Sequence, residues 1–235
     1  MEFYFGLGII IAYLIGSFPT AVVVGKTVYG IDVREHGSGN SGATNTFRVL
    51  GKKPGAFVLF IDVLKGFIAV FFISMLFERF FDKAIFPDFK IDLTLRGYHL
   101  LHYQLTNEAI FPFFKLILAI SAVVGHIYPV FARFKGGKGV ATMLGILFAI
   151  QPIAAFISIA IFALVFGLSN YVSLGSITGA LVYPLIVRFV INHDSMLEIY
   201  FSFLVAFIVI YTHRKNIIRL VNGNESKIYL RSKEK

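Results

Sequence analysis

The chain has 235 residues, of which 57% are hydrophobic and only 15% charged, and its mean hydropathy of +0.78 excludes a soluble globular domain. The net charge of +9 does not indicate nucleic-acid binding, because basic residues in a membrane protein serve to orient it and to attract anionic substrates. The absence of cysteine excludes disulfides, thiolate metal sites and a cysteine acyl-enzyme.

The first apolar segment covers residues 4–24 and contains no charged residue. About 20 helical residues cross the roughly 30 Å of hydrocarbon in a bilayer, so this segment can span it. No basic residues precede the segment, as they would in a signal peptide, and we expect it to remain in the mature protein. Apolar runs bounded by charges, Pro and Gly predict further spans at residues 55–77, 112–131, 173–191 and 196–212.

Residues 139–168 form an apolar stretch of ambiguous length. As one helix the stretch would measure about 45 Å, which is too long for one span and short for two. Pro152 lies near its middle and favours a break there. We therefore predict a helical hairpin that leaves and returns on the same side, and both a double span and a re-entrant loop remain open.

The distribution of charge predicts the orientation. Basic residues dominate 26–54, 132–138 and the tail after 212, so these segments are expected in the cytoplasm, whereas the acidic excess of 78–111 places that segment outside. The predicted fold is all-α, with seven transmembrane helices, the N-terminus outside and the C-terminus inside. Residues 1–235 are expected to form one domain, with 79–111 as an extracytoplasmic insertion.

The segment from His36 to Arg48 is rich in Gly, Ser, Thr and Asn. Its glycines match the dinucleotide pattern G-x-G-x-x-G, but that pattern requires a strand, a helix and a second strand, whereas a membrane span follows here. Glycines expose backbone N–H groups, hydroxyl and amide side chains donate hydrogen bonds and a guanidinium pairs with oxyanions, so the segment suits a phosphate. The alternative is a turn that caps a short interfacial helix through Asn40 or Thr44.

A second cluster, Lys135-Gly-Gly-Lys138-Gly139, stands immediately before an apolar helix. Free N–H groups and the helix dipole favour an anion at such a position. The cluster lacks the G-x-x-x-x-G-K-[ST] pattern of a Walker A loop, so nucleotide hydrolysis is not predicted. A basic connector with a tight glycine turn is the alternative, but three glycines among two lysines favour an anion site. His126 on the preceding helix is equally well explained by a hydrogen bond within the bundle.

The third cluster follows the last span. His213 and Asn216 are three residues apart and therefore share a helix face at the membrane surface, where they could orient a substrate hydroxyl. A basic tail with side chains reaching the headgroups explains the arginines and lysines but not this pair. Within the span 55–77, Asp62 and Lys65 are one helical turn apart, and we assign them first to a structural ion pair.

These clusters together resemble the bacterial acyl-phosphate:glycerol-3-phosphate acyltransferases. The resemblance rests on four motifs in the right order, namely Ser-Gly-Asn-x-Gly-Ala-Thr-Asn-x-x-Arg at 38–48, Gly-His-x-Tyr-Pro-Val-Phe-x-x-Phe-Lys-Gly-Gly-Lys-Gly-Val-Ala-Thr at 125–142, Tyr-Val-Ser-Leu at 171–174 and His-Arg-x-Asn-Ile-x-Arg-Leu at 213–220. It implies transfer of a fatty acyl group from acyl phosphate to the 1-hydroxyl of glycerol 3-phosphate, giving lysophosphatidic acid at the first step of phospholipid synthesis. Acyl-CoA and acyl carrier protein are then not direct donors.

The resemblance also implies residue roles. Ser38, Arg48, Lys138, His213 and Asn216 are expected to be catalytic and Glu225 structural. Asp62, Lys65 and His126 are expected to be structural because of their positions within the spans. The substrate-binding residues are expected to be Gly39, Asn40, Gly42, Thr44, Asn45, Lys135, Gly136, Gly137, Gly139, Thr142, Ser173 and Arg219. No metal or other cofactor is expected. The expected location is the bacterial cytoplasmic membrane with the active site facing the cytoplasm, with functional coupling to the enzyme that forms acyl phosphate.

Acyl phosphate already carries a good leaving group, so the enzyme chiefly has to hold two anions together. No motif carboxylate is an obvious base; we expect the glycerol phosphate group or His213 to accept the hydroxyl proton, and Ser38 to hydrogen-bond rather than attack. An acyl-CoA-dependent acyltransferase is disfavoured, because no histidine has Asp five residues later. A transporter of phosphorylated solutes would fit a broken hairpin, but its polar residues should lie near the midplane and it should show repeats.

Overall fold

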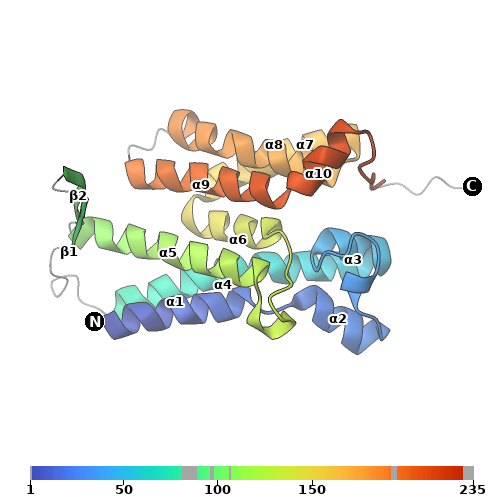
Figure 1. The fold of residues 1–235 in the computed structure, drawn as a ribbon, viewed down its shortest axis with the longest axis horizontal. Coiled ribbons are helices and arrows are strands. Elements are labelled where there is room, and N and C mark those ends of the chain that lie inside the picture. Colours follow the sequence, from blue (N-terminus) through green and yellow to red (C-terminus); the bar gives the residue numbers. More distant parts are fainter. Residues whose placement is uncertain (1, 81–88, 96–97, 106, 192–194, 230–235) are drawn as a thin grey trace, which may run out of the picture.

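Two groups of helices run along the long axis of the computed structural model, which describes residues 2–80, 89–95, 98–105, 107–191 and 195–229 (Figure 1). The first group contains α1 (Glu2–Gly16), α2 (Thr20–Tyr29), α4 (Lys52–Phe80) and α5 (Asn107–Ile127). The second contains α7 (Pro152–Ser169), α8 (Val172–Leu185), which continues into the π-helical turn Ile186–Val190, and α9 (Met196–Thr212). The shorter helices are α3 (Ala43–Val49), α6 (Val140–Ile150), α10 (Arg214–Val221) and the 3₁₀ turns η1 (Val33–Glu35) and η3 (Val130–Ala132).

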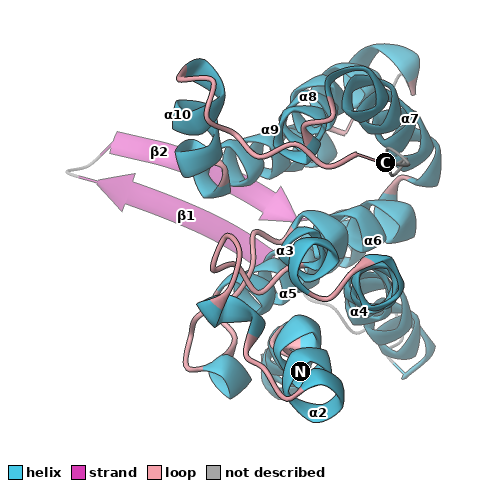
Figure 2. Ribbon diagram, turned by 90° about the vertical axis from the view of Figure 1, so that its right-hand side faces the viewer, coloured by secondary structure: helices cyan, strands magenta, loops and turns pink. Residues whose placement is uncertain are grey.

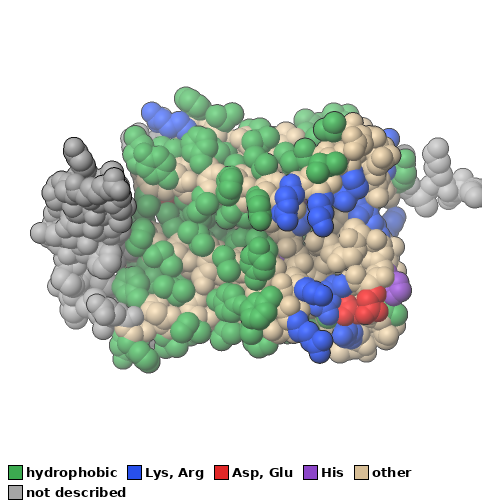
Figure 3. Space-filling view, viewed as in Figure 1, with side chains coloured by type: hydrophobic (Ala, Val, Ile, Leu, Met, Phe, Trp, Pro, Cys, Tyr) green, Lys and Arg blue, Asp and Glu red, His purple; other side chains and the backbone are tan. Residues whose placement is uncertain are grey.

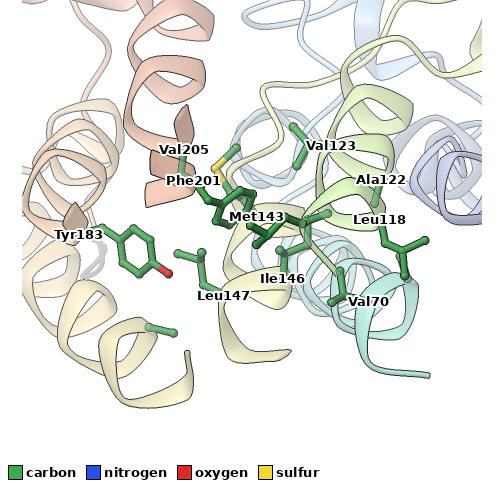
Figure 4. Packing of buried hydrophobic residues seen from close by; sticks show 14 of the residues in the cluster. Val70, Leu118, Ala122, Val123, Met143, Ile146, Leu147, Tyr183, Phe201 and Val205 are labelled. Carbon is green, nitrogen blue, oxygen red and sulfur yellow. The ribbon is translucent and has the colours of Figure 1, made fainter. Parts of the chain in front are cut away.

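Helix α6 joins the two groups. Its buried side chains Met143, Ile146 and Leu147 lie between Val70 and Leu118 of α4 and α5 on one side and residues of α8 and α9 on the other (Figure 4). These residues belong to one continuous hydrophobic core. Lys138 and Gly139 immediately precede α6. Packing of α6 in the core therefore fixes the position of the second predicted cluster along the long axis of the molecule.

Two glycines allow α4 and α6 to touch backbone to backbone. A Cβ atom on Gly66 would collide with the carbonyl oxygen of Thr142, and one on Gly145 would collide with that of Val63. Any side chain at these positions would therefore force the helices apart. Close contact of this kind is typical of helix packing in membranes, where small residues take the place of a hydrophobic driving force.

The predicted span 4–24 is not one continuous helix. Helix α1 ends at Gly16 and α2 begins at Thr20, with a bend of 41° between them. Pro19 explains the break, because proline cannot donate the helical hydrogen bond and restricts the residue before it. The span predicted over 4–24 is therefore bent, and its two helices qualify as a membrane span only when they are taken together.

The predicted hairpin at 139–168 is present, and its two arms differ in length. Helix α7 has 18 residues and is a candidate span, whereas α6 has only 11 residues and is too short to cross the membrane alone. Among the described residues, four helices qualify as spans by length and composition, or up to six if each of two bent pairs counts once. A double span over 139–168 is thus not supported, and the total of seven transmembrane helices stays a prediction.

The segment predicted as an insertion, 79–111, contains an antiparallel two-stranded hairpin, β1 (Phe89–Leu95) and β2 (Tyr98–Leu105). The all-α prediction therefore holds for the apolar part of the chain but not for this connection. The hairpin lies at the end of the molecule where α1 begins, and α10 lies at the opposite end (Figure 1).

Charged and apolar side chains separate along the same axis. Apolar side chains cover the middle of the molecule, and most of the Lys and Arg side chains visible on this face gather toward the C-terminal end (Figure 3). The three polar clusters predicted from the sequence follow α2, α5 and α9, and all of them lie at this basic end.

Candidate active site

The chain turns sharply where the third cluster begins. Helix α9 ends at Thr212, just before His213, and α10 departs from its axis by 62°. The ring Nδ1 of His213 lies 2.8 Å from Val209 O. A carbonyl can only accept, so Nδ1 carries the proton and Nε2 keeps its lone pair. Burial, assisted by the charge of Lys138, lowers the pKa of His213 to about 4, and the neutral ring can accept a proton.

A carboxylate organises this region. The side chain of Glu225 is buried and accepts hydrogen bonds from Ser173 Oγ at 2.9 Å, Asn216 Nδ2 at 2.6 Å and Arg219 Nε at 2.6 Å. Burial alone would raise the pKa of Glu225, but donation by these three groups outweighs it and holds the pKa below its usual value. Glu225 therefore binds the α8 N-terminus to α10 as an ionised group.

Lys138 connects the second cluster with the third. Its Nζ donates a hydrogen bond to Asn216 Oδ1 at 2.6 Å, so the amide of Asn216 lies between Lys138 and Glu225. Burial lowers the pKa of Lys138 to about 8; the charges of Arg219 and Arg48 act in the same direction, while Glu225 opposes them. Lys138 thus reaches Glu225 through Asn216, while Arg219 contacts the same carboxylate directly.

Arg48 brings the first cluster to the same place. It lies on the last turn of α3, and its Nη2 donates to Ser226 O at 3.2 Å. Its Nε is buried and has no hydrogen-bond partner among the described residues. Burial lowers the pKa of Arg48, although the charge of Glu225 counteracts this. A buried N–H group without a partner is costly, and an oxyanion would satisfy it.

The segment after α10 closes this end of the bundle. It crosses between α8 and α3 on its way to the C-terminus, as the end-on view in Figure 2 shows. Besides the contact of Ser226 with Arg48, Ile228 N–H donates to Asn170 O at 2.9 Å in the α7–α8 turn. Four segments distant in sequence thus meet at one site, at residues 38–48, 135–139, 170–173 and 213–228.

Ser38 is held by Asn45. The side-chain oxygen of Asn45 accepts from both the N–H and the hydroxyl of Ser38, at 2.8 and 3.1 Å, while its Nδ2 donates to Val33 O and His36 O at 2.7 and 3.1 Å. Asn45 is only 1% exposed and its amide is fully used. The structure gives it the task of shaping the loop rather than the expected contact with substrate. Gly37, the first glycine of the rejected G-x-G-x-x-G match, has φ of 61°, and a Cβ there would collide with Asn45 Oδ1.

The remaining residues of the first cluster form the start of α3. Gly42 is its N-cap, and no side chain caps the helix, so the alternative of a cap by Asn40 or Thr44 is wrong. Gly39 has φ of 70° and is exposed next to Ser38. Asn40 and Thr44 are half-buried beside this turn.

The glycine-rich loop is hydrogen-bonded to the backbone at the end of α5. Gly136 N–H donates to Ile127 O at 3.2 Å and Gly137 N–H to His126 O at 3.1 Å. The expectation that these two N–H groups are free for an anion is therefore wrong. Gly139, with φ of 80°, is the N-cap of α6. Lys135 is exposed at the surface, so Lys138 is the lysine of this loop that reaches the site.

A buried polar network lies beneath the loop. Asp62 and Lys65 form the expected ion pair at 2.8 Å. Asp62 also accepts from Thr20 Oγ1 at 2.9 Å, and Lys65 donates to Phe18 O at 2.9 Å in the break between α1 and α2. His126 Nδ1 lies 3.0 Å from Thr142 Oγ1. Thr142 is fully buried by this contact, so it supports the loop from below instead of facing a substrate.

One contact between clusters was not predicted from the sequence. Arg34 Nη1 donates to Ala132 O at 3.0 Å, which ties the segment before Ser38 to the segment before Lys135. Asp32, two residues earlier, holds the same guanidinium. The pattern Asp-x-Arg is the only local signal in the sequence, and it does not reveal a partner 98 residues away.

Comparison with known proteins gives consistent matches. A family model described as glycerol-3-phosphate acyltransferase matches residues 6–223. The glycerol-3-phosphate acyltransferase of Chlorobaculum tepidum is 40% identical over 240 residues, covering 94% of each chain. The crystal structure of PlsY (YgiH), an integral membrane glycerol 3-phosphate acyltransferase, is 35% identical in its glycerol 3-phosphate form, with a TM-score of 0.76 over 96% of both chains. Its lysophosphatidic acid form is 34% identical, with a TM-score of 0.73 over 96% of this chain and 95% of that one.

Proposed function

The chain belongs to the glycerol-3-phosphate acyltransferase family, and we propose that it transfers a fatty acyl group from acyl phosphate to the 1-hydroxyl of glycerol 3-phosphate. The products are lysophosphatidic acid and inorganic phosphate. The lysophosphatidic acid form of the related PlsY structure supports this product.

The observation that carries the proposal is the group of cations around Glu225. Arg219 contacts Glu225 directly, Lys138 reaches it through Asn216, and Arg48 contacts the neighbouring Ser226. These three cations come from distant segments, and the one carboxylate balances only one of their charges. Both substrates are anions that repel each other, and the excess positive charge overcomes that repulsion. The Nε of Arg48, which has no hydrogen-bond partner within the described part of the chain, offers a first donor for a phosphate oxygen.

In the reaction, the substrate hydroxyl oxygen forms a bond to the acyl carbon, and the bond from that carbon to phosphate breaks. The hydroxyl proton passes to Nε2 of His213 or to the phosphate group of glycerol phosphate. Asn216, fixed between Lys138 and Glu225, holds the lysine ammonium in place. Ser38 hydrogen-bonds to substrate and does not attack, because its hydroxyl is directed to Asn45 and no base contacts it among the described residues.

We assign supporting roles to several residues expected to bind substrate. Ser173 and Arg219 orient Glu225, Asn45 shapes the Ser38 loop, and Thr142 steadies the glycine-rich loop. Gly39, Asn40, Gly42 and Thr44 form the turn next to Ser38, where the phosphate of one substrate is expected to lie.

The proposed location is the bacterial cytoplasmic membrane, with the N-terminus outside and the basic end in the cytoplasm. The concentration of Lys and Arg at one end of an apolar molecule supports this orientation (Figure 3). Acyl phosphate must then be supplied by a cytoplasmic or membrane-bound acyl-phosphate-forming enzyme. Accessibility of single engineered cysteines at Arg133 and at Lys227 to an impermeant thiol reagent, in intact cells and in inverted vesicles, tests the sidedness.

A donor comparison tests the reaction. Protein purified in detergent is incubated with glycerol 3-phosphate and either acyl phosphate or acyl-CoA, and lysophosphatidic acid is quantified. We expect product from acyl phosphate and none from acyl-CoA. Product from acyl-CoA alone, or from neither donor, would contradict the proposal.

A further inference from the structure

Arg34 uses three nitrogen atoms of one guanidinium plane at once. Nε and Nη2 donate to the two carboxylate oxygens of Asp32, at 2.9 and 2.7 Å, and Nη1 donates to Ala132 O at 3.0 Å. The carboxylate therefore fixes the orientation of the plane, and the third nitrogen reaches a segment 98 residues away. An arginine fork can make such a three-point contact, whereas the single ammonium of lysine cannot.

Asp32 is itself firmly held. Its side chain is 9% exposed, and its Oδ1 also accepts the backbone N–H of Arg34 at 3.0 Å, so it is the N-cap of η1. Donation by the Arg34 side chain outweighs the opposing effect of burial and holds the pKa of Asp32 far below its usual range. The pair is thus charged at any working pH. Lys26 contacts the same carboxylate at 3.2 Å from the solvent side, where its side chain is 56% exposed.

One end of this contact belongs to the Ser38 loop. Asn45 donates to the carbonyls of Val33 and His36, the residues on either side of Arg34 and Glu35, and its oxygen holds Ser38. The segment from residue 33 to residue 38 is therefore one hydrogen-bonded unit. A displacement of Arg34 would move Ser38 with it.

The other end belongs to the Lys138 loop. Ala132 is buried, and its carbonyl also accepts the N–H of Lys135 at 3.2 Å. The two residues between them, Arg133 and Phe134, have left-handed backbone angles of φ 56° and 57°. Such angles are unfavourable for residues other than glycine and persist only where surrounding contacts impose them. The bond from Arg34 is one of those contacts.

We infer that Arg34, oriented by Asp32, is a positioning residue that sets the distance between the Ser38 loop and the Lys138 loop. It touches neither the cations around Glu225 nor Glu225 itself in the described contacts, so it acts through the backbone of both loops. The inference rests on the proposed function, in which Ser38 and Lys138 serve the same pair of substrates. Arg34 is not among the site residues that were predicted from the sequence.

The test compares four variants in the acyl-phosphate assay: Arg34→Gln, Arg34→Lys, Asp32→Asn and the matched control Lys26→Gln. We expect both Arg34 variants to raise KM for glycerol 3-phosphate and to lower kcat/KM about tenfold or more, since misplacement by 1 Å can cost up to about a hundredfold in rate. Asp32→Asn should have a smaller effect in the same direction. Lys26→Gln removes a cation from the same carboxylate without touching Ala132, and should keep at least half of wild-type kcat/KM.

The double variant Asp32→Asn/Arg34→Gln separates positioning from general damage. If Asp32 acts through Arg34, the double variant should have the kcat/KM of Arg34→Gln alone. Losses that multiply, an unchanged KM in the Arg34 variants, or an equal loss in Lys26→Gln would overturn the inference.

A second measurement does not depend on activity. Because the chain has no cysteine, spin labels can be attached solely at His36→Cys and Arg133→Cys, two exposed positions on the two loops. Arg34→Gln should broaden the distance distribution between the labels, and Lys26→Gln should not. An unchanged distance distribution in Arg34→Gln would overturn the inference, whether or not the wild type is active. A wild type that forms no lysophosphatidic acid would overturn the proposed function and leave the distance measurement valid.

Discussion

Lys138 Nζ lies 2.6 Å from Asn216 Oδ1, and the other end of the same amide donates to Glu225 at 2.6 Å. The amide of Asn216 therefore lies between the ammonium group of Lys138 and the carboxylate of Glu225 and contacts both. A salt bridge would neutralise Lys138, whereas the amide leaves its positive charge available to a substrate anion.

Replacing Lys138 by Met should weaken the binding of glycerol 3-phosphate, because a half-buried cation that faces the anion is lost. We expect KM to rise by about tenfold to a hundredfold, equivalent to roughly 1.4–2.8 kcal/mol. Steady-state rates over a range of glycerol 3-phosphate concentrations check this. Lys135→Met is the matched control, since Lys135 is exposed in the same loop, and equal effects of the two variants would contradict the assignment.

Activity should fall on the alkaline side because of Lys138. Its pKa of about 8 lies below the usual value for lysine, so the free enzyme loses this charge as the pH rises through about 8. The profile of kcat/KM should decline above that pH. In Lys138→Arg the cation cannot be deprotonated in this range, so the alkaline decline should disappear whatever the absolute activity. If kcat/KM of Lys138→Arg still declines above pH 8, the decline is caused by a titrating group other than Lys138.

Glu225→Gln should destabilise the basic end of the protein. The amide keeps the shape but cannot accept from Ser173, Asn216 and Arg219 together, at a cost of about 1–3 kcal/mol. Thermal unfolding in detergent measures the loss. Ser173→Ala removes one of the three donors and should cost less, about 1 kcal/mol.

The pKa of Glu225 adds a pH dependence to that stability. It lies below the usual value, so the stabilisation is fully present at neutral pH and is lost as the pH falls through the folded pKa. The stability difference between wild type and Glu225→Gln should therefore shrink in acid. A difference that stays constant down to pH 3 would exclude the ionised carboxylate as its source.

Ser38→Ala should reduce turnover because a hydrogen bond to the substrate is lost. We expect no acyl-enzyme to form on Ser38 in the wild type. We expect the Ser38 hydroxyl to turn from Asn45 to the substrate in the complex, and the loss of one such donor at the reacting centre typically costs about a hundredfold to a thousandfold in kcat. Intact-mass spectrometry of the wild type, incubated with acyl phosphate in the absence of glycerol 3-phosphate, should show no added acyl group. An acyl group trapped on Ser38 would establish a covalent mechanism instead.

Gly145→Ala should destabilise the bundle, because the added Cβ would collide with the carbonyl oxygen of Val63. Forced separation of two packed helices costs about 1–3 kcal/mol or more. Gly167→Ala is the control, since a Cβ there meets no atom within 4 Å, and it should be neutral or stabilising by up to about 1 kcal/mol. Unfolding of the two variants in the same detergent checks the difference.

Much of the site could be recognised from the sequence because its chemistry is local. The apolar runs, the clusters of Lys and Arg and the helical spacing of His213 and Asn216 are each visible within about 20 residues. Each reflects a short-range physical constraint, namely the thickness of the bilayer, the sidedness of charge and the pitch of a helix. The four motifs that carry the family resemblance are also contiguous segments.

The sequence by itself therefore determined the membrane class, the segments that carry the chemistry and the common end at which they lie. Only the tertiary structure decided which atoms are left for a substrate. Gly136, Gly137, Asn45 and Thr142 have the right chemistry for binding, but their polar groups are used within the protein. The only local signal at Arg34 is Asp32, and that signal does not reveal the contact by which Arg34 connects two loops. A hydrogen-bonding group can be satisfied by any partner that folding brings near, so its availability is a property of the packed chain.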